Sequence, residues 1–123
     1  MSYKFRILGC GSSGGVPRVG FGWGNCDPMN KKNRRLRCSL LVQRTIKSRK
    51  TTVLIDTGPD VREQLLQAKV TNLDAVLYTH SHADHVHGID DLRTLAYRKK
   101  GKIPVWACLL YTSDAADDGS RGV

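Results

Sequence analysis

A dense run of histidines directly after a short apolar segment constrains this chain more than any other feature. We expect the apolar segment Leu73–Tyr78 to be a strand, and the run that follows it is Thr79-His80-Ser81-His82-Ala83-Asp84-His85-Val86-His87-Gly88. Side chains two residues apart in extended backbone point to the same side, so His80 and His82 share one face. Asp84 and His85 then enter the first turn of a helix that we predict from about His85 to Lys99.

This spacing predicts a metal site whose first ligands are His80, His82, Asp84 and His85. Imidazole and carboxylate groups together suit zinc, iron or manganese. Two ions a few ångströms apart can generate a hydroxide at neutral pH and stabilise charge that develops on a phosphoryl or acyl group. We therefore expect two divalent ions, Zn²⁺ first and Mn²⁺ as the alternative, with Asp84 as a catalytic residue. His87 lies just past the motif, and we expect it behind the ligands or on the surface.

The rest of the chain predicts a layered α/β domain. Polar and apolar residues alternate from Lys4 to Leu8, which is typical of a strand, and seven glycines between Gly9 and Gly24 indicate a long loop. The other expected elements are strands at Ser39–Thr45, Thr52–Ile55 and Ile103–Ala107, a basic turn at Ile46–Lys50, and a helix capped by Asp60 that carries Val61, Leu65, Leu66 and Ala68 on one face.

Composition and charge restrict the function classes. Hydrophobic residues make up 40% of the chain, and no apolar run approaches the roughly 18 residues of a membrane span. The N-terminus lacks the apolar stretch of a signal peptide, so we expect a cytoplasmic protein that does not contact membranes. The net charge is +9, and nine basic residues but no acid lie between Lys31 and Lys50. This run favours an anionic partner, namely a phosphate ester, a nucleotide or RNA, although it can equally be a solvated loop and hairpin.

The four cysteines are expected to be reduced thiols rather than a disulfide framework. Cys26 and Cys38 can be read in two ways, as ligands of a structural metal or as small half-buried residues.

The histidine motif resembles that of the metallo-β-lactamase superfamily, and the resemblance covers nearly all of residues 4–107. It implies an αββα sandwich of which this chain is the N-terminal half. It also implies that His80 and His82 hold one metal ion while Asp84 and His85 hold the second. Asp56, in Leu54-Ile55-Asp56-Thr57-Gly58, is similar to the superfamily's upstream aspartate, which supports the site from beside the metals. The other reading of Asp56 is a turn or helix-cap residue.

The first residues of the chain indicate which group within the superfamily it resembles. Leu8-Gly9-Cys10-Gly11-Ser12-Ser13-Gly14-Gly15-Val16-Pro17 resembles the glycine-rich start shared by phosphoribosyl cyclic phosphate phosphodiesterases and tRNA 3′-processing endonucleases. Gly58-Pro59-Asp60 and Gly88-Ile89-Asp90-Asp91-Leu92-Arg93 favour the phosphodiesterase-like group. Glycines permit close backbone approach, so Ser12, Ser13 and Gly14 are candidates for contact with a substrate phosphate.

For the intact parent protein we therefore expect a two-metal phosphodiesterase that acts on a small cyclic or linear phosphodiester. The alternative enzyme is a tRNA 3′-processing endonuclease-like hydrolase with RNA as its partner, and a homodimer is left open. The superfamily's later metal ligands have no counterpart here, since no histidine follows His87, and Cys26 stands alone where the phosphodiesterase carries a cysteine-rich zinc site. For the 123 residues as they stand we therefore expect an inactive, incomplete fragment, with residues 1–107 belonging to the domain and residues 108–123 forming a non-native tail.

Overall fold

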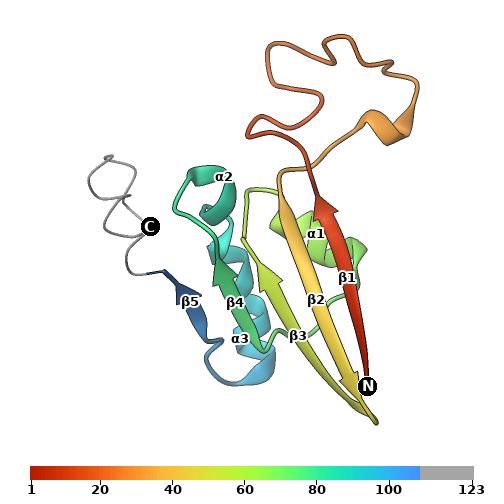
Figure 1. The fold of residues 1–123 in the computed structure, drawn as a ribbon. Helices are drawn as coiled ribbons and strands as arrows, with labels where there is room; N and C mark the ends of the chain where they lie inside the picture. Colours follow the sequence, from red (N-terminus) through yellow and green to blue (C-terminus); the bar gives the residue numbers. More distant parts are fainter. Residues whose placement is uncertain (109–123) are drawn as a thin grey trace.

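The structure is a computed structural model, and it describes residues 1–108. These residues form a five-stranded mixed sheet with helices along one face (Figure 1). Its strands are β1 (Ser2–Gly9), β2 (Ser39–Ile46), β3 (Arg49–Ile55), β4 (Ala75–Tyr78) and β5 (Val105–Ala107). Its helices are α1 (Val61–Gln67), α2 (Ala83–Val86) and α3 (Arg93–Lys99), with short 3₁₀ helices η1 (Lys31–Asn33) and η2 (Ile89–Leu92). The predicted layered α/β order is confirmed. The predicted tail, apart from Cys108, lies outside the described residues.

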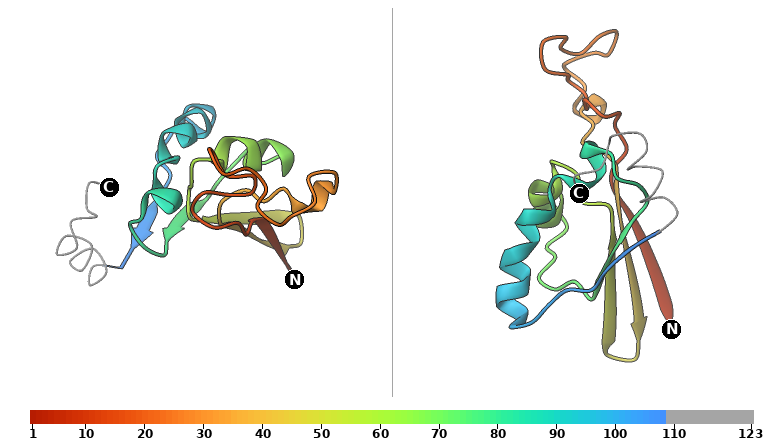
Figure 2. Two further views of the ribbon diagram at one scale, coloured as in Figure 1. Left: turned by 90° about the horizontal axis from the view of Figure 1, so that it is seen from above. Right: turned by 90° about the vertical axis from the view of Figure 1, so that its left-hand side faces the viewer.

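The strand order in the sheet follows the chain order, β1-β2-β3-β4-β5. The first three strands are antiparallel, whereas β4 runs parallel to β3, and β5 runs parallel to β4. A parallel neighbour needs a crossover connection. Here α1 makes the first crossover and the segment from α2 to α3 makes the second, and both lie on the same sheet face (Figure 2). Among residues 1–108, no helix has the length and apolar character needed to cross a membrane.

The hydrophobic core lies between this sheet face and the helices. Its buried members come from every layer and are Leu41, Leu54, Val61, Leu65, Leu73, Val76 and Leu92. The strand residues alternate with partly exposed ones, as the period of two requires. Burial of each such side chain contributes about 1.5–3 kcal/mol to folding, so this cluster fixes how the helices sit on the sheet.

The opposite sheet face is also apolar, but it is exposed. Tyr3, Phe5 and Ile7 of β1 lie on it, and Phe5 pairs with Val42 in the neighbouring strand. Trp106 of β5 is exposed as well, beside Leu77 of β4. In the part of the chain that the structure describes, the helices lie only on the other face (Figure 2).

Helix α1 departs from the prediction at two side chains. Leu66 was expected on the buried face, but it is 58% exposed. The buried residues Val61, Gln64 and Leu65 instead follow the helical spacing i, i+3 and i+4, which places Leu66 at least about 100° away from each of them. Asp60 does occupy the N-cap position, but its side chain makes no capping hydrogen bond because it binds Arg37.

The predicted helix from His85 to Lys99 is wrong, because α2, η2 and α3 replace it. The break falls at Gly88, where a β-carbon would run into the carbonyl oxygen of Gly58. The chain passes so close to the end of β3 that a continuous helix with side chains cannot fit. The predicted turn Ile46–Lys50 is also shorter, since β2 ends at Ile46 and β3 begins at Arg49.

Thr57 ties α2 to the end of β3. Its backbone N–H donates to the carbonyl of His85 over 2.8 Å, and its own carbonyl accepts from the N–H of Gly88 over 2.9 Å. Its hydroxyl lies 2.6 Å from the hydroxyl of Tyr78 and donates to the carbonyl of Val86 over 3.3 Å. Thr57 is fully buried, so these bonds fix the position of the helix that carries His85.

Replacement of Gly88 by alanine should destabilise the fold. The added methyl group must displace backbone at the Gly58 crossing, and overpacking of this kind costs about 1–3 kcal/mol. Urea unfolding of the 123-residue chain measures the change. Gly101→Ala is the matched control, because a β-carbon there meets open space. Equal stability of the two variants would contradict the close crossing.

Thr57→Val keeps the side-chain shape and removes the hydroxyl. It leaves the hydroxyl of Tyr78 and the carbonyl of Val86 without this partner, which we expect to cost about 1–3 kcal/mol. Thr94→Val, at an exposed site with a hydrogen bond of similar length to Asp91, should change stability by less than about 0.5 kcal/mol. Urea unfolding measures the stability of both variants. If Thr57→Val lost no more stability than Thr94→Val, this would contradict the role given to the Thr57 hydroxyl.

Candidate metal centre

The residues predicted as metal ligands gather where β3 and β4 end and α2 begins. The ring centroids of His80 and His82 are 4.7 Å apart, and those of His80 and His85 are 3.9 Å apart. Nε2 of His85 lies 3.3 Å from a carboxylate oxygen of Asp84. Asp56 joins them from the end of β3, with an oxygen 2.6 Å from Nδ1 of His85. The structure therefore brings all four predicted ligands and the predicted supporting aspartate to one place.

Asp56 reaches this position through an uncommon backbone conformation. Its φ angle is +68°, in the left-handed region that side chains other than those of glycine, asparagine and aspartate rarely adopt. Its carboxylate is almost completely buried and accepts three hydrogen bonds, from the backbone N–H of Thr79, from the Thr79 hydroxyl and from Nδ1 of His85. A buried carboxylate with three donors is held in a single orientation.

These bonds assign the proton positions on two imidazole rings. Nδ1 of His85 donates to the Asp56 carboxylate, so the lone pair of a neutral ring lies on Nε2. The Thr79 hydroxyl gives its proton to Asp56 over 2.6 Å and therefore accepts from Nδ1 of His80 over 2.8 Å. The lone pair of His80 is thus also on Nε2. One carboxylate consequently sets both rings for ligation through Nε2.

The donor set fits a metal ion. Nε2 of His85 and the Asp84 carboxylate are both electron-pair donors at 3.3 Å, and such a pair is stable only with a shared cation or proton between them. Asp56, His80 and His85 each offer one potential ligand atom, and these three atoms lie within 4.8 Å of one another. Because Asp56 already accepts three hydrogen bonds, its geometry favours the supporting position over direct ligation.

The environment disfavours the charged form of His80. Burial lowers the pKa of its imidazole, and the neighbouring rings of His85 and His82 lower it further, against the opposing charges of Asp56 and Asp84. A neutral imidazole is the form that ligates metal. His82 is more exposed and stands at the N-cap of α2, whereas His87 is the exposed C-cap residue of the same helix. His87 therefore lies on the surface, one of the two positions predicted for it.

The glycine-rich loop leaves the sheet at the same end as α2 (Figure 1). Ser12 and Ser13 are exposed, and the Ser12 carbonyl accepts from the N–H of Gly15 in a tight turn. Gly14 packs against the Arg18 side chain, where a β-carbon would come within 2.6 Å of Cγ. These contacts form the turn itself and do not place a substrate on it.

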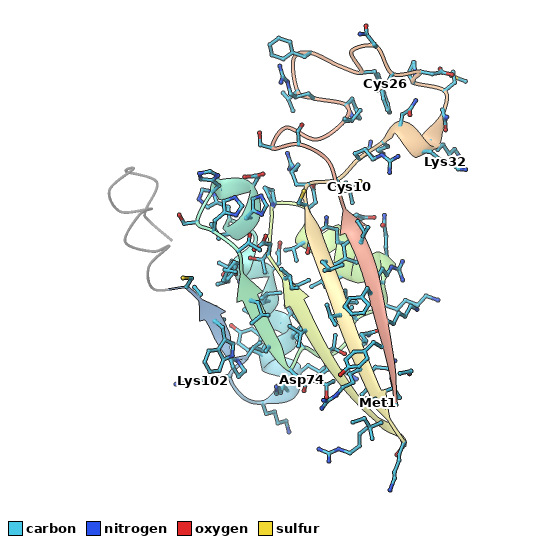
Figure 3. All side chains as sticks on the ribbon, viewed as in Figure 1. Met1, Cys10, Cys26, Lys32, Asp74 and Lys102 are labelled. Atoms are coloured by element: carbon cyan, nitrogen blue, oxygen red, sulfur yellow. The ribbon has the colours of Figure 1, made fainter. Side chains whose placement is uncertain are left out.

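The two cysteines considered as structural metal ligands lie in different settings. Cys26 is exposed and far along the loop, whose base is marked by Cys10 (Figure 3). Cys38 is half-buried, and its thiol donates to the carbonyl of Gly11 over 3.3 Å. Burial, followed by the charge of Asp84, raises the pKa of the Cys38 thiol. The potential metal group found among the described residues contains neither cysteine.

Sequence reasoning missed three residues that hold the site. Thr79 carries the bond between Asp56 and His80, Thr57 holds α2, and Arg37 binds Asp60. Thr79 directly precedes the histidine motif, and Thr57 directly follows Asp56, so adjacency was the available signal for both. Arg37 stood within the basic run and gave no such signal, because its partner is 23 residues away.

Comparison with known sequences identifies the family. A family model described as a beta-lactamase superfamily domain matches residues 51–120, more than half of the chain. An octanoyltransferase of Porphyromonas gingivalis is 45% identical over 94 residues, which are 76% of this chain but 18% of that protein.

Solved structures agree with the family match. The crystal structure of a new diphosphatase from the PhnP family is 36% identical with a TM-score of 0.79, and the match covers 97% of this chain and 46% of that one. Zn²⁺-bound PqqB from Methylobacterium extorquens is 22% identical with a TM-score of 0.57, over 97% of this chain and 41% of that one.

The metallo-beta-lactamase fold protein YhfI from Bacillus subtilis is 21% identical with a TM-score of 0.60, and the match covers 94% of this chain and 42% of that one. This chain thus spans less than half the length of each of these structures, and its sheet and helices correspond to one β layer and one α layer of the predicted αββα sandwich. The predicted superfamily and fold class are confirmed, and the chain belongs to the beta-lactamase superfamily domain family.

Proposed function

We propose that this chain belongs to a metal-dependent phosphodiesterase that hydrolyses a small cyclic or linear phosphodiester. The observation that carries the proposal is the convergence of His80, His82, Asp84 and His85 beside a buried aspartate that sets two of the imidazole rings. The 36% identity to a diphosphatase supports phosphorus chemistry in particular. The octanoyltransferase name is not carried over, because this chain corresponds to only 18% of that protein.

Two divalent ions, Zn²⁺ first and Mn²⁺ as the alternative, would be held by His80 with His82 and by Asp84 with His85, and would polarise the phosphoryl group and make water more acidic. The chain's own residues prepare this site. Asp56 holds the rings of His80 and His85 with their Nε2 atoms as ligands, so no reorientation is needed when an ion binds. The backbone hydrogen bonds of Thr57 hold α2 against the end of β3. This fixed donor geometry is what an in-line displacement at phosphorus requires.

The charge of the chain supports an anionic substrate. The net charge is +9, and the basic side chains of Arg34 and Arg35 are exposed beside the glycine-rich loop. We propose that Ser12, Ser13 and Gly14 contact the substrate phosphate, since a tight turn with exposed hydroxyls can supply both backbone and side-chain donors. RNA processing remains the alternative, supported by the same basic surface. We also propose that the protein is cytoplasmic.

Metal binding should depend on His80 and not on His87. His80→Ala removes a ring that Thr79 and Asp56 hold in place, and we expect it to weaken Zn²⁺ binding by at least about tenfold, the lower end of what loss of a supporting residue costs. His87→Ala is the matched control, because it removes a histidine seven residues away that is exposed. Competition with a coloured chelator measures both affinities. Equal Zn²⁺ affinity in the two variants would contradict the assigned site.

Hydrolysis should follow the same pattern. The whole parent protein loaded with Zn²⁺ or Mn²⁺ should hydrolyse bis(p-nitrophenyl) phosphate, and His80→Ala should lower the rate by more than about 100-fold. His87→Ala should stay within about twofold of the unaltered chain. A nucleoside 2′,3′-cyclic phosphate, a diphosphate ester and a precursor tRNA test the substrate class. No rate above that of the metal alone would contradict the proposed activity of the parent protein.

A further inference from the structure

We propose that Arg37, held by Asp60 and Gln64 of the α1 segment, is a positioning residue that fixes the glycine-rich loop, residues 10–17, beside the metal centre. The three residues are called the Arg37 latch below. This inference rests on the proposed function, because it assigns the loop a place in substrate binding. The latch lies outside the predicted ligand set, and it joins two segments that are more than 20 residues apart in the sequence.

Asp60 and Gln64 together bind the backbone N–H and carbonyl of Arg37 and two of its guanidinium nitrogens. The Asp60 carboxylate accepts from the backbone N–H of Arg37 over 2.9 Å, from Nε over 2.7 Å and from Nη2 over 3.1 Å. One turn further along the helix, Nε2 of Gln64 donates to the carbonyl of Arg37 over 2.8 Å. Gln64 is only 1% exposed, so this amide is part of the core. A bidentate, charge-assisted contact of this kind restricts orientation as well as distance.

Backbone hydrogen bonds join the residues just before Arg37 to the glycine-rich loop. The N–H of Gly11 donates to the carbonyl of Leu36 over 2.7 Å, and Val16 exchanges two backbone hydrogen bonds with Arg35. A β-carbon at Gly15 would lie 3.3 Å from Cδ of Arg37, so the loop backbone also rests close to the latch side chain. Both ends of the loop are therefore fastened to residues 35–37, and Arg37 fastens those residues to α1.

The other side of the latch leads to the metal centre. Asp60 lies three residues after Thr57 in the sequence, and Thr57 binds the backbone of α2. A β-carbon at Gly58 would run into the carbonyl oxygen of Asp84 and lie 3.7 Å from Cβ of Arg37. The segment 57–60 thus contacts a predicted ligand on one side and the latch on the other. Release of the latch should move the loop relative to the ligands while the core stays packed.

An ion pair can also simply stabilise a fold, and the experiment must separate the two roles. The chain offers a matched control in Arg93 and Asp90, an exposed pair at 3.7 Å on α3 and η2. The test variants are Arg37→Lys, which keeps the charge but not the paired contacts, and Asp60→Asn, which keeps the shape but not the charge. Asp60→Glu retains the charge and serves as the rescue variant.

Limited trypsin digestion of the 123-residue chain measures loop release. We expect Arg37→Lys and Asp60→Asn to accelerate cleavage after Arg18 and Arg35 by at least about tenfold, as loss of charge-assisted hydrogen bonds raises the open population. Cleavage after Arg44, in the middle of the sheet, should be unchanged, and Asp60→Glu and the Arg93→Lys control should behave as the unaltered chain. No acceleration, or equal acceleration at Arg44 in the milder Arg37→Lys variant, would overturn the proposal.

Kinetics then test the role in substrate binding. With bis(p-nitrophenyl) phosphate, Arg37→Lys should raise KM by about tenfold and leave kcat within about twofold, the pattern of lost substrate positioning. Its Zn²⁺ affinity should not change. A lower kcat with unaltered KM would overturn the positioning role. These kinetic measurements use the whole parent protein, and if it hydrolyses no substrate, the proposed function fails. The trypsin result on the 123-residue chain still decides whether the latch holds the loop.

Discussion

The buried carboxylate of Asp56 is the interaction on which the candidate site depends. Asp56 directly follows β3 and has a left-handed backbone conformation. Its carboxylate accepts hydrogen bonds from the segment after β4 and from α2. Three pieces of chain are therefore joined through one side chain. The same bonds determine which nitrogen of His80 and of His85 carries the proton. Structural support and preparation of the ligands are thus a single arrangement, and neither can change without the other.

Close backbone packing makes this arrangement possible. Gly58 lies against the Asp84 carbonyl, and Gly88 lies against the Gly58 carbonyl, so the end of β3 and the two ends of α2 meet without intervening side chains. Thr57 fills the same crossing with four hydrogen bonds. Helix α2 is a single turn, and a helix this short has little stability of its own. Its position comes from these contacts.

One face of the sheet is covered by helices, and the other face is exposed although it is apolar. One face is covered by α1 and by the segment from α2 to α3, and the other exposes apolar residues such as Phe5 and Trp106. Exposed apolar patches of this kind mark interaction surfaces. The chain also spans less than half of each solved structure it resembles.

The sequence by itself determined the strands, the succession of strands and helices along the chain, and the residues of the metal motif. Alternation and histidine spacing are local patterns, so they indicate which side chains share a face without knowledge of the fold. The tertiary structure alone decided the break of the helix at Gly88, the exposure of Leu66 and the pairing of Asp60 with Arg37 instead of the helix end. It also decided the tautomers, through the bonds of Thr79. Each of these depends on atoms from distant segments that meet only after folding, and no local pattern encodes such a meeting.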